Sequence, residues 1–217
     1  MLSKISKYLI KIRIKYSKEI KIIIGAGNTK YKGWISTDIN ELDITKHKDF
    51  DFLFKNKKID NILMEHVVEH LEYEAFISFL YTVKKYLKKG GVIRIAVPDS
   101  NHPSLYVKKL TVINGIEPGA NDHKYFYSIK DFEDIAEKTG FTLKKLEYFD
   151  FNGFFHISQY DFKNGYISRC SKNYKGRFTD DKDEYQKMIE TVPNELKKQF
   201  FEKGISYTSL LVDFIYD

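Results

Sequence analysis

Cysteine, proline, tryptophan and long apolar runs are scarce or absent in this sequence. It holds one cysteine, four prolines and one tryptophan among 217 residues, and no apolar run is long enough to span a bilayer. The single cysteine, Cys170, excludes an internal disulfide framework and a cysteine-ligated zinc site. Charged residues make up 30% and hydrophobic residues 42%, which excludes a disordered chain and a collagen. The first residues do not resemble a secretory signal. We therefore expect one cytoplasmic domain.

The formal net charge of +6 is concentrated near the N-terminus. Residues 1–33 hold nine basic residues and one acid, whereas the remainder holds 27 basic and 29 acidic residues. A protein that binds nucleic acid usually spreads basic residues over its binding face. This distribution predicts no nucleic-acid partner.

Residues 1–19 form a basic N-terminal segment. Apolar residues fall at helical spacing, which predicts an amphipathic helix whose apolar face packs on the domain: Ile5, Leu9, Ile12 and Tyr16. Residues 10–15 also alternate between isoleucine and a basic residue, which is strand spacing. A helix on an anionic membrane surface is a further alternative, with weak membrane contact through this segment.

Short apolar strands alternate with helical patterns along the rest of the chain. Strands are expected at 21–24, 34–38, 42–45, 59–64, 92–97, 141–149 and 207–215, and helices at 75–87, 129–138 and 184–203, the last broken at Pro193. This alternation predicts an α/β domain with a mostly parallel sheet. The expected division is a basic segment 1–19, a cofactor-binding core 20–150, an aromatic-rich insertion or cap 151–206, and a closing strand 207–217.

A glycine turn follows the first strand of the core. Gly25-Ala26-Gly27 lets the backbone approach a ligand closely, and Asp38 stands at the end of the next strand, where it can accept hydrogen bonds from ribose hydroxyls. The pair indicates an adenosine-containing ligand. Lys30 occupies the place of the third glycine in G-x-G-x-x-G, which disfavours a nicotinamide or flavin dinucleotide.

Three successive segments resemble the motifs of class I S-adenosylmethionine-dependent methyltransferases: IIIGAGNTKYKGWISTDI, IDNILMEHVVEHL and YLKKGGVIRIAVPDSNH. NDHKYFYSIKDFEDIAEKTGF resembles a segment of a small bacterial subgroup associated with surface-polysaccharide synthesis. The resemblance implies a Rossmann-like sheet with a C-terminal antiparallel strand, helices on both faces, and S-adenosylmethionine as the cofactor. The link between Asp38 and Asp43 is too short for the family's usual helix.

The resemblance also implies which residues bind the cofactor. The glycine turn would line the methionine and ribose portions, Asp38 would bind the ribose, and Asp43 would contact the adenine. The two residues after the 59–64 strand would face the methionine end and the transferring methyl group. The full set is Gly25, Ala26, Gly27, Asp38, Asp43, Glu65 and His66.

Residues 66–70 read His-x-x-Glu-His, which matches an inverted zinc-protease motif. That motif requires both histidines on one helix, so that they share a zinc ion. Here a strand runs straight into His66. We therefore expect no metalloprotease and assign no metal ligands, and whether a divalent metal assists the reaction stays open.

Methyl transfer to a hydroxyl releases a proton, so a positioned base assists it, and histidine titrates near neutral pH. The candidates are His66, His102, His123 and His156, with Asp99 at the end of the 92–97 strand. The loop that carries His123 follows this strand, which makes it the first choice and His102 the second. Each could equally be an ordinary surface or hydrogen-bonded histidine.

The resemblance leads to a methyltransferase that methylates a hydroxyl of a sugar, sugar nucleotide or phosphorylated sugar for a cell-surface glycan. A nicotinamide-dependent oxidoreductase and a non-catalytic cofactor-binding module are the alternatives. The aromatic residues around 148–162 either line the acceptor pocket or fill a core. The oligomeric state stays open.

Overall fold

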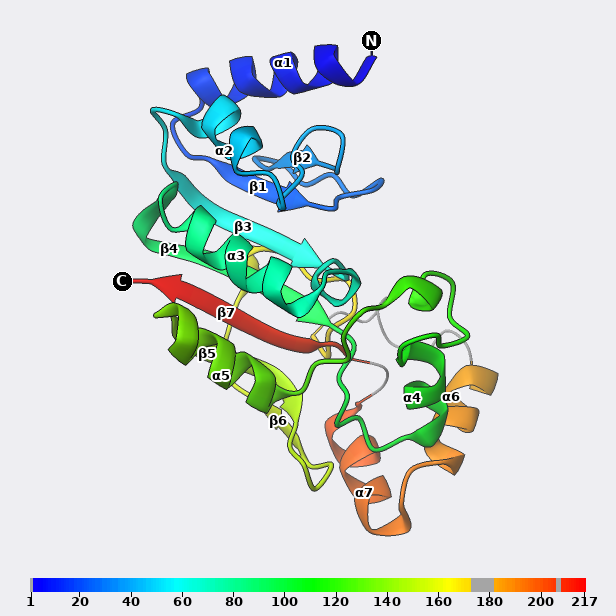
Figure 1. The fold of residues 1–217 in the computed structure, drawn as a ribbon. Helices are drawn as coiled ribbons and strands as arrows, with labels where there is room; N and C mark the ends of the chain where they lie inside the picture. The colour runs from blue at the N-terminus through cyan, green and yellow to red at the C-terminus, as the bar shows by residue number, and fades with distance from the viewer. Residues whose placement is uncertain (1, 173–181, 206–207) are drawn as a thin grey trace.

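A seven-stranded sheet organises the computed structural model, which describes residues 2–172, 182–205 and 208–217 (Figure 1). The spatial order is β2-β1-β3-β4-β7-β5-β6. The strands are β1 (Lys21–Ile24), β2 (Ile35–Thr37), β3 (Ile59–Glu65), β4 (Leu87–Val97), β5 (Thr142–Phe149), β6 (Phe155–Ile157) and β7 (Leu210–Tyr216). β2, β1, β3 and β4 pair in parallel, and β7 runs antiparallel to both β4 and β5. The expected Rossmann-like class, with its closing antiparallel strand, is confirmed.

The described helices are α1 (Leu2–Tyr16), α2 (His47–Phe54), α3 (Tyr73–Val83), α4 (Leu105–Thr111), α5 (Ile129–Thr139), α6 (Lys182–Glu190) and α7 (Asn194–Lys203). α2, α3 and α5 bury the main core against one face of the sheet (Figure 1). Large aromatic side chains such as Phe50, Phe76 and Phe132 fill it. None of the described helices has the length and apolar character that crossing a bilayer requires.

The opposite face of the sheet is covered by residues 158–171, drawn in yellow behind the sheet in Figure 1. Tyr160, Ile167 and Cys170 pack there against Ile23 and Leu63. The helical structure in this segment is a short 3-10 turn, Phe162–Asn164. The link between β1 and β2 forms turns and no helix.

The sequence signals for α5 and for the C-terminal helices are borne out. Ser128 and Asp131 form a reciprocal capping box at the start of α5, and Gly140 ends the helix with a φ of 66°. The break at Pro193 separates α6 from α7. A turn at Asn152-Gly153 joins β5 to the antiparallel strand β6.

Other elements differ from the expectation. Residues 42–45 form no strand, because the Asp43 side chain accepts hydrogen bonds from Thr45 and shapes a turn. The helix expected at 75–87 ends at Val83, and the Lys-Lys-Gly-Gly stretch belongs to β4. α2 and α4 were not expected. Tyr207, where the closing strand was expected to begin, lies outside the described residues.

α1 is the helix that the N-terminal pattern predicts, but its other side packs on the domain. Ile14 is buried and Ile10 packs beside it against the main core. Arg13 donates a hydrogen bond to the Trp34 carbonyl oxygen at 2.8 Å. The residues expected to pack are exposed instead, by 53% to 75%: Ile5, Leu9, Ile12 and Tyr16. The helix carries two apolar stripes, and the contacts of Ile14 and Arg13 select the stripe that docks.

A small cluster at the carboxyl end of the sheet joins α4, α6 and α7. Their apolar faces enclose Phe149 at the end of β5 and Phe155 in β6. Ser104 caps α4 and also bonds the Thr191 hydroxyl at 2.7 Å, which ties α4 to the end of α6. The cluster lies beside the edge where the parallel strands end (Figure 1).

A buried ion pair joins β4 to its neighbour β7 and also contacts the segment behind the sheet. Arg94 donates to both carboxylate oxygens of Asp213, at 2.7 and 2.8 Å, and both side chains are almost fully buried. The remaining guanidinium nitrogen donates to the carbonyl oxygens of Asp161 and Gly165. This one side chain therefore holds the central strands and the covering segment together.

Replacing Asp213 by asparagine leaves the Arg94 charge buried without its counter-ion. We expect Asp213→Asn to lower the free energy of unfolding by about 3–5 kcal/mol. Urea unfolding of the wild-type and variant proteins measures the difference. The double variant Arg94→Met/Asp213→Leu should recover part of this loss, because an apolar pair removes the buried charge. A single variant as stable as the wild type would contradict this role.

Candidate active site

The turns after β1 and β3 meet at the carboxyl edge of the sheet. Gly25 has a φ of 63°, and a Cβ at this position would lie 2.5 Å from Cγ2 of Val67. His66 also takes a left-handed conformation, with a φ of 55°. A side chain at residue 25 would be strained and would collide with the neighbouring turn. The glycine is therefore required by both the backbone and the contact.

Two cavities adjoin at this point and share Gly25, His66 and His70. The first has a volume of about 420 Å³ and lies beside the turn after β2. We call it the acid-rimmed cavity, because Asp38 and Asp43 stand among its otherwise mostly apolar walls. Its apolar lining consists of Ile24, Ile39, Leu42, Ile44, Val67 and Leu71.

The two acids of this cavity are held by hydrogen bonds. Asp38 accepts from the backbone N–H groups of Gly27 and Ile39, at 3.1 and 3.3 Å. Asp43 accepts from the backbone N–H and hydroxyl of Thr45. Burial acts to raise the pKa of Asp43, but hydrogen bonds from Lys46 and Thr45 hold it below its usual value. The Asp43 side chain is therefore a fixed carboxylate at neutral pH.

The second cavity has a volume of about 280 Å³, and we call it the polar cavity. Its lining comes from β1, the turn after β3, residues 117–123 and the insertion. The polar and charged side chains are Thr29, Glu65, His66, Glu69, His70, Glu117, His123, Ser168 and Arg169. Ala26 lines it as well, whereas Gly27 does not, although Gly27 binds Asp38.

Glu65 and His66 connect the end of β3 to distant parts of the chain. Glu65 accepts hydrogen bonds from Ser168 and from the backbone N–H of Arg169 at 3.0 Å. His66 uses one ring nitrogen toward Glu69 at 3.0 Å and the other toward the Ser209 hydroxyl at 3.2 Å. The insertion and β7 thus help to shape the polar cavity.

His123 lies at the far side of the polar cavity, 8% exposed. Its Nδ1 is 2.8 Å from the carbonyl oxygen of Thr111, so this nitrogen carries the hydrogen. The His70 ring lies 4.8 Å from the His123 ring between centroids, and Nδ1 of His70 is 2.8 Å from Asp122. The sequence candidate His123 therefore shares the cavity with Glu65 and His66.

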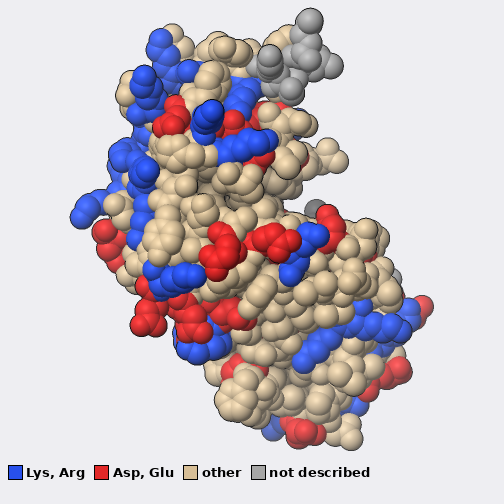
Figure 2. All heavy atoms as spheres, in the orientation of Figure 1, with Lys and Arg blue, Asp and Glu red and all other residues tan. Residues whose placement is uncertain are grey.

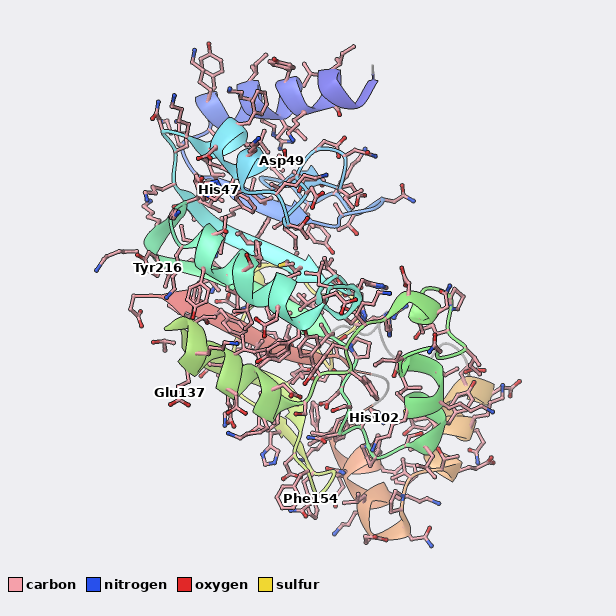
Figure 3. The ribbon with its side chains drawn as sticks, in the orientation of Figure 1. His47, Asp49, His102, Glu137, Phe154 and Tyr216 are labelled. Carbon is pink, nitrogen blue, oxygen red and sulfur yellow. The ribbon has the colours of Figure 1, made fainter. Side chains whose placement is uncertain are left out.

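His102 and Asp99 line neither cavity. His102 is 1% exposed and packs against Phe149 and Phe200 near α4 and α7 (Figure 3). Its Nδ1 accepts a hydrogen bond from the backbone N–H of Ser104 at 3.1 Å, and burial lowers its pKa to about 3. Asp99 accepts from the backbone of Phe149 at 2.7 Å, and burial raises its pKa to about 7. The structure does not bring these two residues to His123.

The His-x-x-Glu-His stretch does not lie within one helix. His66 belongs to the turn after β3, and Val68–His70 forms a 3-10 helix, η1. Among the described residues, the group with close metal-ligating atoms combines Glu69 and His70 with His123, and leaves His66 out. The remaining candidate, His156, stacks on Tyr148 and binds Asp150, away from both cavities.

Some residues of the polar cavity carried no signal in the sequence. Ser168 and Arg169 lie in the insertion, and Glu117 lies in the loop before His123, where it pairs with Arg169 at 3.0 Å. Their approach to Glu65 depends on tertiary packing over more than one hundred residues of chain. Glu69 and His70 did stand in the His-x-x-Glu-His motif of the sequence. That motif grouped them with His66, whereas the structure places them beside His123.

Residues 15–146 match the family described as Methyltransferase domain, and the chain belongs to this family. Over 106 residues it is 31% identical to the ubiquinone biosynthesis O-methyltransferase of Pelagibacter ubique, which covers 47% of this chain. The match covers 43% of that relative, so the chain spans less than half of its length.

Solved structures with a similar fold include two methyltransferases. A SAM-dependent methyltransferase from Archaeoglobus fulgidus is 17% identical, covers 96% of this chain and 93% of its own, and has a TM-score of 0.46. The magnesium protoporphyrin IX methyltransferase from Synechocystis PCC 6803, with bound SAH, is 12% identical, covers 69% and 80%, and has a TM-score of 0.38. Family membership confirms the expected cofactor, S-adenosylmethionine, and sets aside the nicotinamide-dependent alternative.

The burial of His102 gives a testable pH dependence. Its pKa is about 3 in the folded chain and 6.5 in an unperturbed side chain, so the unfolded chain binds more protons between these values. Stability is therefore lost as the pH falls through this window. In His102→Asn the side-chain oxygen can still accept from Ser104, and we expect a shallower loss. Urea unfolding between pH 7 and pH 4 measures it, and parallel pH profiles for the two proteins would refute the assignment.

Proposed function

We propose that this protein transfers the methyl group of S-adenosylmethionine to a hydroxyl oxygen of a sugar, sugar nucleotide or phosphorylated sugar used for a cell-surface glycan. The observation that carries the proposal is the pair of cavities that adjoin at Gly25 and His66. One has apolar walls and fixed carboxylates, which suit an adenosine. The other is polar and suits a hydroxyl-rich acceptor.

In this proposal the adenosine of the cofactor occupies the acid-rimmed cavity. Asp38 accepts hydrogen bonds from the ribose hydroxyls, and Asp43 lies at the adenine end. The methionine portion passes Gly25 and Ala26 toward Glu65 and His66. Gly25 lines both cavities, so a ligand that extends from one cavity into the other passes this residue.

The chemistry is a direct displacement. A lone pair of the acceptor oxygen forms the new bond to the methyl carbon, and the carbon–sulfur bond breaks with its electron pair left on sulfur. The sulfonium becomes a neutral thioether, and the hydroxyl proton leaves. Because the donor is already activated, the protein mainly aligns the acceptor, excludes water and assists the proton.

His123 is the proposed acceptor of that proton. It lines the polar cavity, and Nδ1 is committed to the Thr111 carbonyl oxygen, so Nε2 is the nitrogen available to a substrate. His102 and Asp99, the other candidates from the sequence, have the disadvantage of lying in the interior. A proton acceptor must be able to reach the reacting hydroxyl.

The acceptor class rests on the polar cavity. Its carboxylates and hydroxyl can bind a polyhydroxylated molecule. The Pelagibacter relative is named as an O-methyltransferase, which supports oxygen as the methylated atom. The aromatic residues around 148–162 do not line this cavity: Phe149 and Phe155 are buried in the cluster with α4, α6 and α7, and Phe151 is 87% exposed.

A screen of sugar nucleotides and phosphorylated sugars with methyl-labelled cofactor tests the acceptor class. Label transferred only to phenols or amines would overturn it, and cofactor binding without any turnover would favour a non-catalytic module.

Asp38→Ala should weaken the binding of S-adenosylmethionine by about 1.5–3 kcal/mol, because hydrogen bonds to a charged acceptor are lost. Isothermal titration calorimetry measures this change. Asp38→Asn is the matched control, since its amide oxygen still accepts from Gly27 and the local turn is kept. A folded Asp38→Ala protein with wild-type affinity would remove Asp38 from the site.

His123→Asn should lower turnover by about 10²–10⁴-fold, with little change in cofactor affinity. His102→Asn, assayed in parallel, should keep its turnover, because His102 lines neither cavity. If His102→Asn loses turnover and His123→Asn keeps it, the two roles are exchanged.

In this proposal the protein is a cytoplasmic enzyme, and its helix α1 lies against an anionic membrane surface. The exposed apolar stripe of α1 supports it, together with exposed Lys11 and Lys15 on the same helix. Lys and Arg side chains gather around this end of the molecule in Figure 2. A single buried cysteine suits a reducing compartment.

The double variant Leu9→Asp/Ile12→Asp should abolish co-sedimentation with anionic vesicles and leave stability nearly unchanged, since both side chains are more than half exposed. Binding of the wild-type chain should weaken with added salt, because the attraction between Lys or Arg and lipid headgroups is screened. Zwitterionic vesicles are the control. Equal sedimentation of the wild type and the double variant would contradict the proposal.

A further inference from the structure

Two loops that are distant in sequence bring three metal-ligating side chains together. Glu69 and His70 belong to η1, directly after β3, and His123 follows a second 3-10 turn, Ala120–Asp122. One ligating atom from each residue lies within 4.8 Å of the others. The backbone carbonyl oxygen of Glu69 accepts from Lys124 and Tyr125, which locks the two loops against each other.

Both histidines are oriented as metal-ligating histidines are. Nδ1 of His123 is 2.8 Å from the Thr111 carbonyl oxygen, and Nδ1 of His70 is 2.8 Å from Asp122. A carbonyl or carboxylate at one ring nitrogen fixes the tautomer and leaves the lone pair on the other nitrogen. In each ring that nitrogen is Nε2, and the two rings lie 4.8 Å apart.

Glu69 supplies a second, independent observation. Its side chain is 1% exposed, and one oxygen binds His66 at 3.0 Å. Among the residues that the structure describes, the other oxygen, Oε2, has no hydrogen-bond partner although it is fully buried. A buried carboxylate oxygen without a partner is costly and rare. A cation at this position would satisfy it.

We propose that Glu69, His70 and His123 hold a divalent transition-metal ion, with zinc as the best match, in the wall of the polar cavity. Two imidazoles and one carboxylate leave a fourth position open, as in catalytic zinc sites. Ligand bonds of about 2.1 Å place tetrahedral ligand atoms about 3.4 Å apart, so on binding the distances between the ligand atoms shorten by at most about 1.4 Å. The sequence alone indicated no metal site, because the third ligand comes from a distant loop.

The role of this ion in methyl transfer rests on the function proposed above. All three proposed ligands line the cavity in which the acceptor hydroxyl would lie. A cation next to that hydroxyl lowers its pKa, so that its proton passes to solvent before the oxygen attacks the methyl carbon. One nitrogen cannot both bind a metal and accept a proton. With the ion bound, His123 is therefore a ligand and the ion takes over the task assigned above to a base.

Metal binding is measured first, without cofactor or acceptor. The full chain is treated with a chelator, dialysed, and titrated with zinc chloride in a calorimeter, and cobalt(II) is added in a parallel experiment as a probe with a visible absorption spectrum. We expect one equivalent of zinc to bind, with a tetrahedral cobalt spectrum. Magnesium should bind far more weakly, because it prefers oxygen ligands.

The variants His70→Ala, His123→Ala and Glu69→Gln should each weaken zinc binding by at least 10-fold and remove the cobalt spectrum. His156→Ala is the matched control, since that histidine lies outside the cluster and should leave both unchanged. Tyr127→Phe is a second control. It removes one of the two other fully buried groups without a partner among the described residues, the second being Nε2 of His102, and zinc affinity should persist. No stoichiometric binding by the wild type, or an equal loss in His156→Ala, would overturn the site.

Turnover then tests the role of the ion separately. If the ion acts on the acceptor, chelation abolishes methyl transfer and zinc restores it, while S-adenosylmethionine binding to Asp38 is unaffected. Unchanged turnover after chelation would overturn this role and leave His123 as the base. Failure of every acceptor, with zinc still bound at the three ligands, would overturn the proposed function and not the metal site.

Discussion

The site depends on one steric constraint, the contact between the turns that leave β1 and β3. Gly25 and His66 both adopt left-handed backbone conformations, and the space for a side chain at Gly25 is taken by Val67. These two turns form the wall shared by both cavities. The turn at His66 also directs the chain into η1, so that Glu69 and His70 face the loop of His123. A side chain at residue 25 would therefore disturb both cavities together.

The insertion completes this arrangement. It covers the face of the sheet opposite α3 and α5, and its carbonyl oxygens bind the buried Arg94. The same segment places Ser168 and Arg169 on Glu65 at the rim of the polar cavity. A buried guanidinium costs free energy unless all its donors are satisfied. Arg94 has a carboxylate and two carbonyl oxygens as partners, so it commits the covering segment to one position. One covering segment thus makes both the hydrogen bonds that hold it to the back of the sheet, at Arg94, and those that shape the polar cavity, at Glu65.

The sequence predicted the parts that local signals encode. The β1 strand with its glycine turn, Asp38 after β2, and the capping box of α5 were all readable from short patterns. The docking face of α1 was wrong, because the helix has two apolar stripes and only the position of its neighbours selects between them. His102 was favoured for its place after a strand, but periodicity does not reveal that Phe149 and Phe200 enclose it. Ser168 and Arg169 reach the site through contacts that no local pattern encodes.

The charges around the polar cavity bear on both halves of the methyl-transfer reaction. Glu65 and Glu69 line it, and a positively charged sulfonium would be attracted by these carboxylates, whereas the charge of Glu117 is balanced by Arg169. After transfer the sulfur is neutral and this attraction is lost, which favours release of the product. The same carboxylates would hinder the ionisation of an acceptor hydroxyl, since a developing negative oxygen is repelled by them. Glu69 paired with a cation would remove that conflict, because its charge would then be neutralised on the acceptor side, while in the proposed arrangement Glu65 would still attract the sulfonium. The arrangement of these acids is thus easier to reconcile with methyl transfer when a cation occupies the cluster of Glu69, His70 and His123.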